Sequence, residues 1–279
     1  HPVGVVAAIT PCTNPTVTPL GNFMHAVKGK NALVISPHPR SLQTTTDTVN
    51  LIREALVKCG APADLIQVLA EPSMAASAEL MAACDLVLAT GAFGLTKAAY
   101  ASGTPAYGVG PGNPPVVLDR GYDLEAAAKM TVVAVGSDNG ILCDGDNMLL
   151  HPQEEEAALF EALRKEGVVV FDKAEDVAKF REVLFVNGKS NPDLVGKDAP
   201  VIAKAAGFDI PAETKVVALK VEAVGSADIL NKEIMGPVVV TKGYDTFEEA
   251  VDMAIQNMVE SGGIGHTAGI FSNDDAHVR

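Results

Sequence analysis

Short apolar runs that alternate with amphipathic stretches are the feature that most constrains the fold of this chain. In the first half, such runs occupy residues 3–9, 31–36, 65–70, 85–91 and 105–110. Each run is brief, apolar throughout and bounded by Gly, Pro or Asp, which is typical of parallel strands buried on both faces. The intervening residues 46–60 and 73–84 have the apolar stripe or the N-cap serine of helices. This alternation predicts βαβ units and a doubly wound, Rossmann-like parallel sheet.

The alternation of strand-like and helix-like segments continues after about residue 113, where the segments contain more charged residues. Helices are predicted over residues 153–167, 174–185 and 246–261. Strands are predicted over residues 168–172, 215–221, 236–241 and 267–272. The segment GNPP (112–115) is a natural hinge. We therefore predict two α/β lobes with mostly parallel sheets, a nucleotide-binding lobe over residues 1–113 and a second lobe over residues 114–279.

Composition and charge exclude several classes of function. The net charge of −14 argues against general binding of nucleic acid or of anionic membranes, which requires a basic surface. No apolar run is long enough to span a membrane and no signal peptide precedes the first run, so we expect a cytoplasmic protein. The chain opens on a strand-like run without an initiator Met, which suggests a fragment.

The cysteines give one candidate for chemistry. The 4 cysteines, Cys12, Cys59, Cys84 and Cys143, are widely spaced without a C-x-x-C pair, so we predict neither a metal site nor a redox dithiol. Cys143 lies in SDNGILCDGDN. Taken alone, this segment is compatible with three roles for the cysteine: a structural thiol, a metal ligand or a nucleophile. Asp144 and Asp146 would raise its thiol pKa and so disfavour the reactive thiolate.

Several loops after predicted strands hold candidate binding residues. In ATGAFGLTKAA (89–99), Gly91 and Gly94 stand where a strand gives way to a helix, and backbone N–H groups there can face a phosphate. The glycines have a purely geometric interpretation as well. SPHPR (36–40) offers His38 and Arg40, or is a proline-stiffened loop. GVGPGNPP (108–115) either turns sharply or lets a ligand approach the backbone closely.

Blocks in a fixed order resemble the CoA-acylating aldehyde dehydrogenases. They are VVAAITPCTNPTVTPLGNFMHAVKGKNALVISPHPRS, ATGAFGLTKAAYASGTPAYGVGPGNPPVVLD, DNGILC, EIMGPV and GHTAGIFS, and they span nearly the whole chain. This branch of the aldehyde dehydrogenase superfamily includes CoA-dependent succinate-semialdehyde dehydrogenase and the aldehyde dehydrogenase half of bifunctional aldehyde/alcohol dehydrogenases. The usual family chain is longer at both ends.

The resemblance implies roles for individual residues. Cys143 is implied to attack an aldehyde, to pass hydride to NAD or NADP through a thiohemiacetal, and to retain a thioester. The side-chain amide of Asn14 and the backbone N–H of Cys143 are implied to hold the oxyanion. Glu233 is implied to bind the nicotinamide-side ribose, and His266 to assist proton transfer.

The resemblance also implies where the cofactor binds. Gly91 and Gly94 match the turn against the pyrophosphate, and Ser36 and His38 match the region near the adenosine ribose. These residues do not distinguish NAD from NADP.

Val109 aligns with the glutamate that activates water in hydrolytic members. Because valine cannot activate water, the thioester on Cys143 should survive until the thiol of coenzyme A attacks it. Coenzyme A is therefore the expected co-substrate. A hydrolytic enzyme that yields the free acid and a catalytically inactive scaffold are the alternatives. The aldehyde stays open among succinate semialdehyde, sulfoacetaldehyde, acetaldehyde and others, and the full-length protein is expected to be a homo-oligomer.

Overall fold

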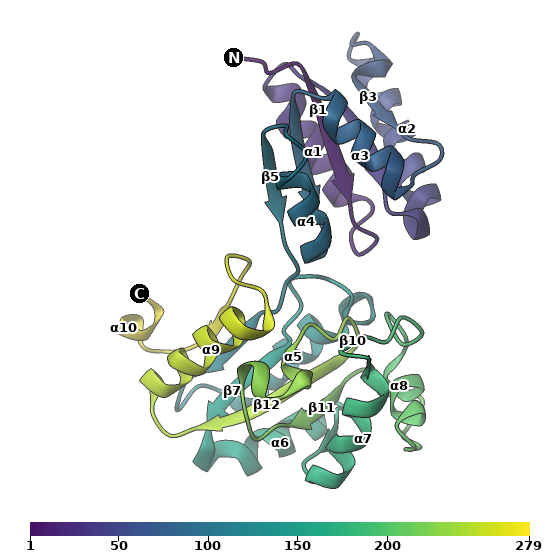
Figure 1. Ribbon diagram of the computed structural model, residues 1–279. Helices are drawn as coiled ribbons and strands as arrows, with labels where there is room; N and C mark the ends of the chain where they lie inside the picture. The colour runs from purple at the N-terminus through teal and green to yellow at the C-terminus, as the bar shows by residue number, and fades with distance from the viewer. The chain divides into compact units, whose positions relative to one another are not determined.

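The computed structural model describes residues His1–Arg279 as two compact units, His1–Pro111 and Gly112–Arg279. The division falls beside the GNPP segment. Both units consist of a sheet with helices on its faces (Figure 1).

The first unit is built on a five-stranded sheet. Its strands are β1 (Val5–Thr10), β2 (Ala32–Pro37), β3 (Ile66–Val68), β4 (Leu86–Thr90) and β5 (Ala106–Val109). The order is β3-β2-β1-β4-β5, and every neighbouring pair is parallel. The predicted doubly wound sheet is confirmed, with strands where the apolar runs predicted them. The strand order changes direction between β1 and β4, and ligands of open α/β sheets bind at the carboxyl ends of the strands beside such a point.

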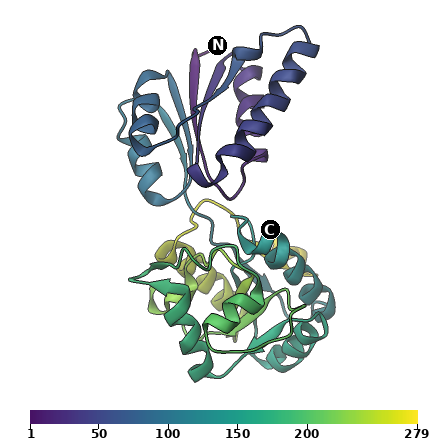
Figure 2. The ribbon, with the colours of Figure 1, turned by 90° about the vertical axis from the view of Figure 1, so that its right-hand side faces the viewer.

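Helices cover both faces of this sheet. They are α1 (Val17–Lys28), α2 (Leu42–Lys58), α3 (Met74–Ala83) and α4 (Phe93–Tyr100). On β1, Val6 and Ala8 pack in the cluster with α1 and α2, whereas Ala7 and Ile9 pack in the cluster with α3 and α4. Figure 2 shows these helices on opposite sides of the strands. Because successive side chains of a strand point to opposite faces, a strand buried on both faces must be apolar throughout.

The second unit contains a six-stranded sheet. Its strands are β6 (Pro115–Leu118), β7 (Met148–Pro152), β8 (Val169–Phe171), β11 (Val217–Lys220), β12 (Val238–Tyr244) and β13 (Gly269–Phe271). The order is β13-β6-β7-β12-β11-β8, again with parallel pairs throughout. A separate hairpin pairs β9 (Phe185–Val186) with β10 (Lys189–Ser190).

The second sheet also lies between two layers of helices. These helices are α5 (Leu124–Gly136), α6 (Glu156–Lys165), α7 (Ala174–Leu184), α8 (Ala199–Ala205), α9 (Phe247–Ser261) and the short α10 (Asp275–Val278). Leu149 of β7 packs with α5 and α6, whereas its neighbours Met148 and Leu150 pack with α7, α8 and α9. The sheet therefore fixes the ends of two connections, the one from α5 to β7 and the segment that precedes β12.

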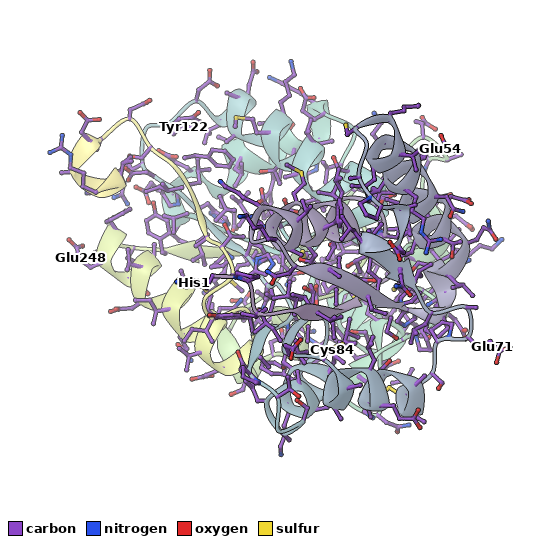
Figure 3. The ribbon with its side chains drawn as sticks, turned by 90° about the horizontal axis from the view of Figure 1, so that it is seen from above. His1, Glu54, Glu71, Cys84, Tyr122 and Glu248 are labelled. Atoms are coloured by element: carbon purple, nitrogen blue, oxygen red, sulfur yellow. The ribbon has the colours of Figure 1, made fainter.

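The chain carries a net charge of −14. Glu54, Glu71 and Glu248 are exposed, and their side chains project into solvent in Figure 3. None of the helices combines the length and the apolar character that crossing a membrane requires.

Candidate functional site

Cys143 lies in the connection from α5 to β7, after a turn of unusual backbone conformation. Asp138, Asn139 and Gly140 have φ values of 49°, 52° and 67° and so form a left-handed turn. Residues other than glycine seldom adopt this conformation, although Asp and Asn tolerate it better than most. Two consecutive non-glycine residues in it indicate that the surrounding structure imposes the turn.

Contacts from the rest of the second unit hold this turn. The side-chain amide of Asn139 donates to Oδ1 of Asp198 at 2.8 Å and to the carbonyl of Gly196 at 3.2 Å. A Cβ at Gly140 would overlap the carbonyl of Gly236, so this position requires glycine for contact as well as for conformation.

Gly112 meets the same turn from another side. A Cβ at Gly112 would overlap the carbonyl oxygen of Cys143. The Gly-Pro-rich segment does let a group approach the backbone closely, as the sequence suggested. That group is the carbonyl of the chain's own Cys143.

A small cavity of about 20 Å³ lies beside Cys143, with room for about one water molecule. The residues that line it come from three segments and include Gly112, Leu142, Cys143, Asp146, Glu233 and Met235. The structure thus brings together two residues that the sequence predicted to act jointly, Cys143 and Glu233. Asp146, close to the cysteine in sequence, lines the cavity as well.

The environment of Cys143 disfavours its thiolate. Burial raises its pKa most, the charges of Asp144 and Glu233 raise it further, and its own backbone N–H lowers it slightly. The predicted effect of the acidic neighbours is confirmed for Asp144, which is exposed, whereas Asp146 is not among the causes of the shift.

Two carboxyl groups at the cavity also have raised pKa values. Burial raises the pKa of Glu233 from 4.5 to about 7. Burial, followed by the charge of Asp144, raises the pKa of Asp146 from 3.8 to about 6. No hydrogen bond from the protein offsets the burial of Glu233. Its carboxylate is therefore available to accept hydrogen bonds from a ligand.

Asn14 belongs to the first unit and follows the carboxyl end of β1. Its Oδ1 accepts a hydrogen bond from the backbone N–H of Val17, 3.1 Å away. This bond fixes the orientation of the amide and leaves the Nδ2 group free to donate. An asparagine used as an oxyanion donor needs this arrangement.

The predicted cofactor residues follow β2 and β4 in the first unit. Gly91 succeeds β4, and Gly94 lies in the first turn of α4, where backbone N–H groups have no partner within the helix. His38 succeeds β2, and its Nδ1 accepts from the N–H of Arg40 at 3.2 Å. Burial and then the charge of Arg40 lower the pKa of His38. These residues and Asn14 therefore share the carboxyl edge of one sheet.

Ser36 is placed differently from the other predicted cofactor residues. It is only 1% exposed, and its Oγ lies 2.8 Å from Oγ of Ser77, which in turn donates to the carbonyl of Ser73. The side chain thus ties β2 to α3. A contact of its hydroxyl with a cofactor would require this internal bond to break.

His266 lies in a glycine-rich loop between α9 and β13. Its backbone N–H donates to the carbonyl of Gly263 at 3.0 Å, and its Nδ1 is buried without a hydrogen-bond partner. Gly262, Gly263 and Gly265 all have positive φ values, so the loop depends on glycine for its course. His266 is not among the residues that line the cavity of Cys143.

The cysteines form no pairs in the structure, where all 4 are free thiols. No group of three or more His, Cys, Asp or Glu side chains is arranged to hold a metal ion. Cys143 is distinguished from the other thiols by the lined cavity beside it and by the imposed turn before it.

Comparisons with known proteins agree with this geometry. The model of the aldehyde dehydrogenase family matches residues 1–168, which is more than half of the 279 residues. The chain belongs to the aldehyde dehydrogenase family. The resemblance recognised in the ordered sequence blocks is thereby confirmed.

Individual family members show which branch the chain is similar to. It is 46% identical over 278 residues to a succinate-semialdehyde dehydrogenase (acetylating) from Clostridium kluyveri, covering 100% of this chain and 61% of that protein. An acetylating aldehyde dehydrogenase from Geobacillus thermoglucosidasius superposes with a TM-score of 0.94 at 37% identity, covering 100% of this chain and 62% of that one. A propionaldehyde dehydrogenase from Rhodopseudomonas palustris, solved with bound propionyl-CoA, gives a TM-score of 0.88 at 29% identity, covering 100% of this chain and 61% of that one.

These matches confirm the predicted aldehyde dehydrogenase-like α/β fold with mostly parallel sheets. The chain spans about three fifths of the length of these relatives.

Proposed function

We propose that this chain carries the catalytic core of a CoA-acylating, NAD(P)-dependent aldehyde dehydrogenase. The overall reaction converts an aldehyde, coenzyme A and NAD(P)+ to an acyl-CoA, NAD(P)H and a proton, and it is reversible. The observation that carries the proposal is the cavity shared by Cys143 and Glu233, in a family member whose relatives are acylating enzymes.

The residues present suit a dinucleotide cofactor. The doubly wound sheet and the first turn of α4, which contains Gly94, offer free backbone N–H groups to a pyrophosphate, whereas the N–H of Gly91 donates to the carbonyl of Val109 at 3.0 Å. The carboxylate of Glu233, which accepts no hydrogen bond from the protein, suits the two hydroxyls of a ribose. When bound, the cofactor supplies the acceptor for hydride, and the chain's own residues supply binding and orientation.

Cys143 supplies the covalent chemistry. Its sulfur forms a bond to the aldehyde carbon as the carbonyl π bond breaks and the thiol proton passes to a base such as the ring of His266, giving the oxyanion of a thiohemiacetal. The resemblance assigns the stabilisation of the developing oxyanion to the side-chain amide of Asn14 and the backbone N–H of Cys143. Loss of hydride from that carbon leaves a thioester, which the thiol of coenzyme A attacks to release acyl-CoA and the Cys143 thiol. His266 has a free ring nitrogen with which to accept a proton.

Val109 favours acyl transfer over hydrolysis. It ends β5 with 47% of its surface exposed, and it replaces the glutamate that the resemblance assigns to the activation of water. An aliphatic side chain cannot deprotonate water, so the thioester persists until a thiol attacks it.

The setting of the full-length protein forms part of the proposal. Free cysteines suit a reducing compartment, which supports the cytoplasm. Val251, Ile255 and Val259 form an exposed apolar stripe on α9 that suits contact with another subunit of a homo-oligomer. Succinate semialdehyde is the first aldehyde to test, because the relative from Clostridium kluyveri bears its name.

The decisive test replaces Cys143 in the intact protein that contains this chain. Wild-type protein should form NADH or NADPH from succinate semialdehyde only when coenzyme A is present, with succinyl-CoA as product by mass spectrometry. Cys143→Ala should reduce this to background, whereas Cys59→Ala, which removes an exposed thiol, should leave it intact. Turnover retained in Cys143→Ala, or free acid formed without coenzyme A, would contradict the proposal.

A further inference from the structure

Asn147 forms hydrogen bonds with the backbone on both sides of Glu233. Its Nδ2 donates to the carbonyl of Lys232 at 3.1 Å, and its Oδ1 accepts from the N–H of Ile234 at 3.4 Å. A single amide side chain therefore satisfies the two backbone groups that flank the glutamate. This pairing resembles one rung of a sheet, supplied by a side chain instead of a strand.

Asn147 is itself anchored to the sheet. Its backbone N–H donates to the carbonyl of Pro114 at 3.0 Å, and its carbonyl accepts from the N–H of Val240 at 3.0 Å. It stands four positions after Cys143, immediately before β7. The side chain that holds the Glu233 segment is thus attached to the same short stretch of chain as the nucleophile.

A second buried asparagine supports the first. The Nδ2 group of Asn147 also donates to Oδ1 of Asn113 at 2.6 Å, and Nδ2 of Asn113 donates to the carbonyl of Asn231 at 2.7 Å. Asn147 is 7% exposed and Asn113 is 1% exposed. Buried amides that form complete hydrogen bonds specify a single geometry, because any displacement leaves a polar group without a partner.

The carboxylate of Glu233 has no comparable support of its own. No hydrogen bond from the protein reaches it, and only the backbone of its segment is held, by Asn147 and by Oγ of Ser190, which donates to the Glu233 carbonyl at 3.2 Å. The location of the carboxylate therefore depends on the backbone contacts alone.

We propose that Asn147 is a positioning residue that fixes Glu233 relative to Cys143 and so sets the affinity for the ribose-bearing cofactor. The inference rests on the proposed function for the role of Glu233, and on geometry for the coupling. Asn113 orients the Asn147 amide so that its Nδ2 faces the carbonyl of Lys232.

The first experiment is a double-mutant cycle in the intact protein. Asn147→Ala should raise the KM for NAD(P)+ by about tenfold to a hundredfold, because small displacements of a binding group cost that much. The KM for the aldehyde should change by less than about threefold. In a Glu233→Gln background, Asn147→Ala should cause no further rise, because coupled residues are not additive.

Asn257→Ala is the matched control. Asn257 is also fully buried, and its Oδ1 accepts only from the N–H of Gly225, at 3.3 Å. Its loss should lower stability without raising the KM for the cofactor. Should Asn147→Ala fail to fold, Asn113→Ala keeps both bonds from Asn147 to the Glu233 segment and removes only the support of the Asn147 amide, and it should give a smaller rise. An equal KM in the Asn147 and Asn257 variants, or the same rise with and without Glu233, would overturn the proposal.

A second readout does not depend on catalysis. The charge of Glu233 raises the pKa of the Cys143 thiol, so Glu233→Gln should shift the alkylation of Cys143 by iodoacetamide to lower pH. Asn147→Ala should shift the pH dependence of alkylation in the same direction. The double variant should shift it no further than Glu233→Gln alone. The control, Asn257→Ala, should leave the pH dependence unchanged. If the wild type lacks CoA-dependent turnover, the proposed function fails, while this profile still decides whether Asn147 holds Glu233 beside Cys143. An unchanged profile in Asn147→Ala refutes the coupling.

Discussion

The buried carboxyl of Glu233 should make the protein less stable as the pH rises. Its pKa in the folded protein is about 7, against an ordinary value of 4.5, because burial disfavours the charged form. Between these two values the folded protein binds more protons than the unfolded chain does. This contribution to stability is fully present below about pH 4.5 and is lost as the pH rises through about 7.

The size of the effect follows from the same values. A rise from 4.5 to about 7 corresponds to roughly 3 kcal/mol between the two protonation states. Glu233 is only partly buried, so solvent screening reduces this ceiling, and we expect about 1–2 kcal/mol. Glu233→Gln should therefore be more stable than wild type by about 1–2 kcal/mol at pH 8 and of equal stability near pH 4.

Urea unfolding at a series of pH values, followed by circular dichroism, measures this difference. Glu213→Gln, at an exposed loop position of the same unit, controls for loss of a negative charge and should follow the wild-type pH dependence. The reasoning would be refuted if Glu233→Gln and wild type lost stability in parallel between pH 4 and pH 8. It would be refuted as well if Glu213→Gln gained as much at high pH.

Two further predictions concern the backbone turn and the first sheet. Gly140→Ala should destabilise the protein by about 3 kcal/mol or more, because φ is +67° and a Cβ would overlap the Gly236 carbonyl. The control is Gly188→Ala, at a position with φ +75° and open space around it. It should cost only about 1 kcal/mol in the same denaturation assay. Ser36→Ala should cost about 1 kcal/mol through loss of its bond to Ser77 and leave the KM for NAD(P)+ unchanged. A cofactor KM that rises in Ser36→Ala without loss of stability would instead support a direct contact of the hydroxyl.

The sequence predicted the first unit well because its strands are buried on both faces. Such strands must be apolar throughout, so each one appears as a short run between turn residues. The same reasoning missed parts of the second unit. β6 and β7 are apolar runs too, but they lie beside the GNPP hinge and the Cys143 segment, and those motifs drew the interpretation toward loops. α5 was also missed, although Asp123 accepts from the N–H groups of Glu125 and Ala126 at its start.

The candidate site was predictable where a motif carried it and not where tertiary contacts did. Cys143 and Glu233 were identified from their blocks, and they line one cavity. The requirement for glycine at position 112 could not be predicted from the sequence. The group that excludes a side chain there is the Cys143 carbonyl, which is distant in sequence. Asp144 and Asp146 are likewise equivalent in the sequence. Only burial separates the exposed Asp144 from Asp146, whose pKa rises to about 6.

Unfavourable features concentrate around Cys143 and are rare in the two sheets. The turn before it is left-handed at Asp138 and Asn139, and Met235, which lines the same cavity, has a positive φ of 55°. Burial raises the pKa of two carboxyl groups beside it. Each feature costs stability, of the order of 1–3 kcal/mol for a strained residue. A sequence selected for stability alone would remove them, since less strained turns and an amide at position 233 are available. Their presence next to a thiol, within otherwise well-packed parallel sheets, is typical of a site of chemistry. The same argument predicts opposite signs for the effects of Glu233→Gln, a gain in stability at pH 8 and a loss of cofactor affinity.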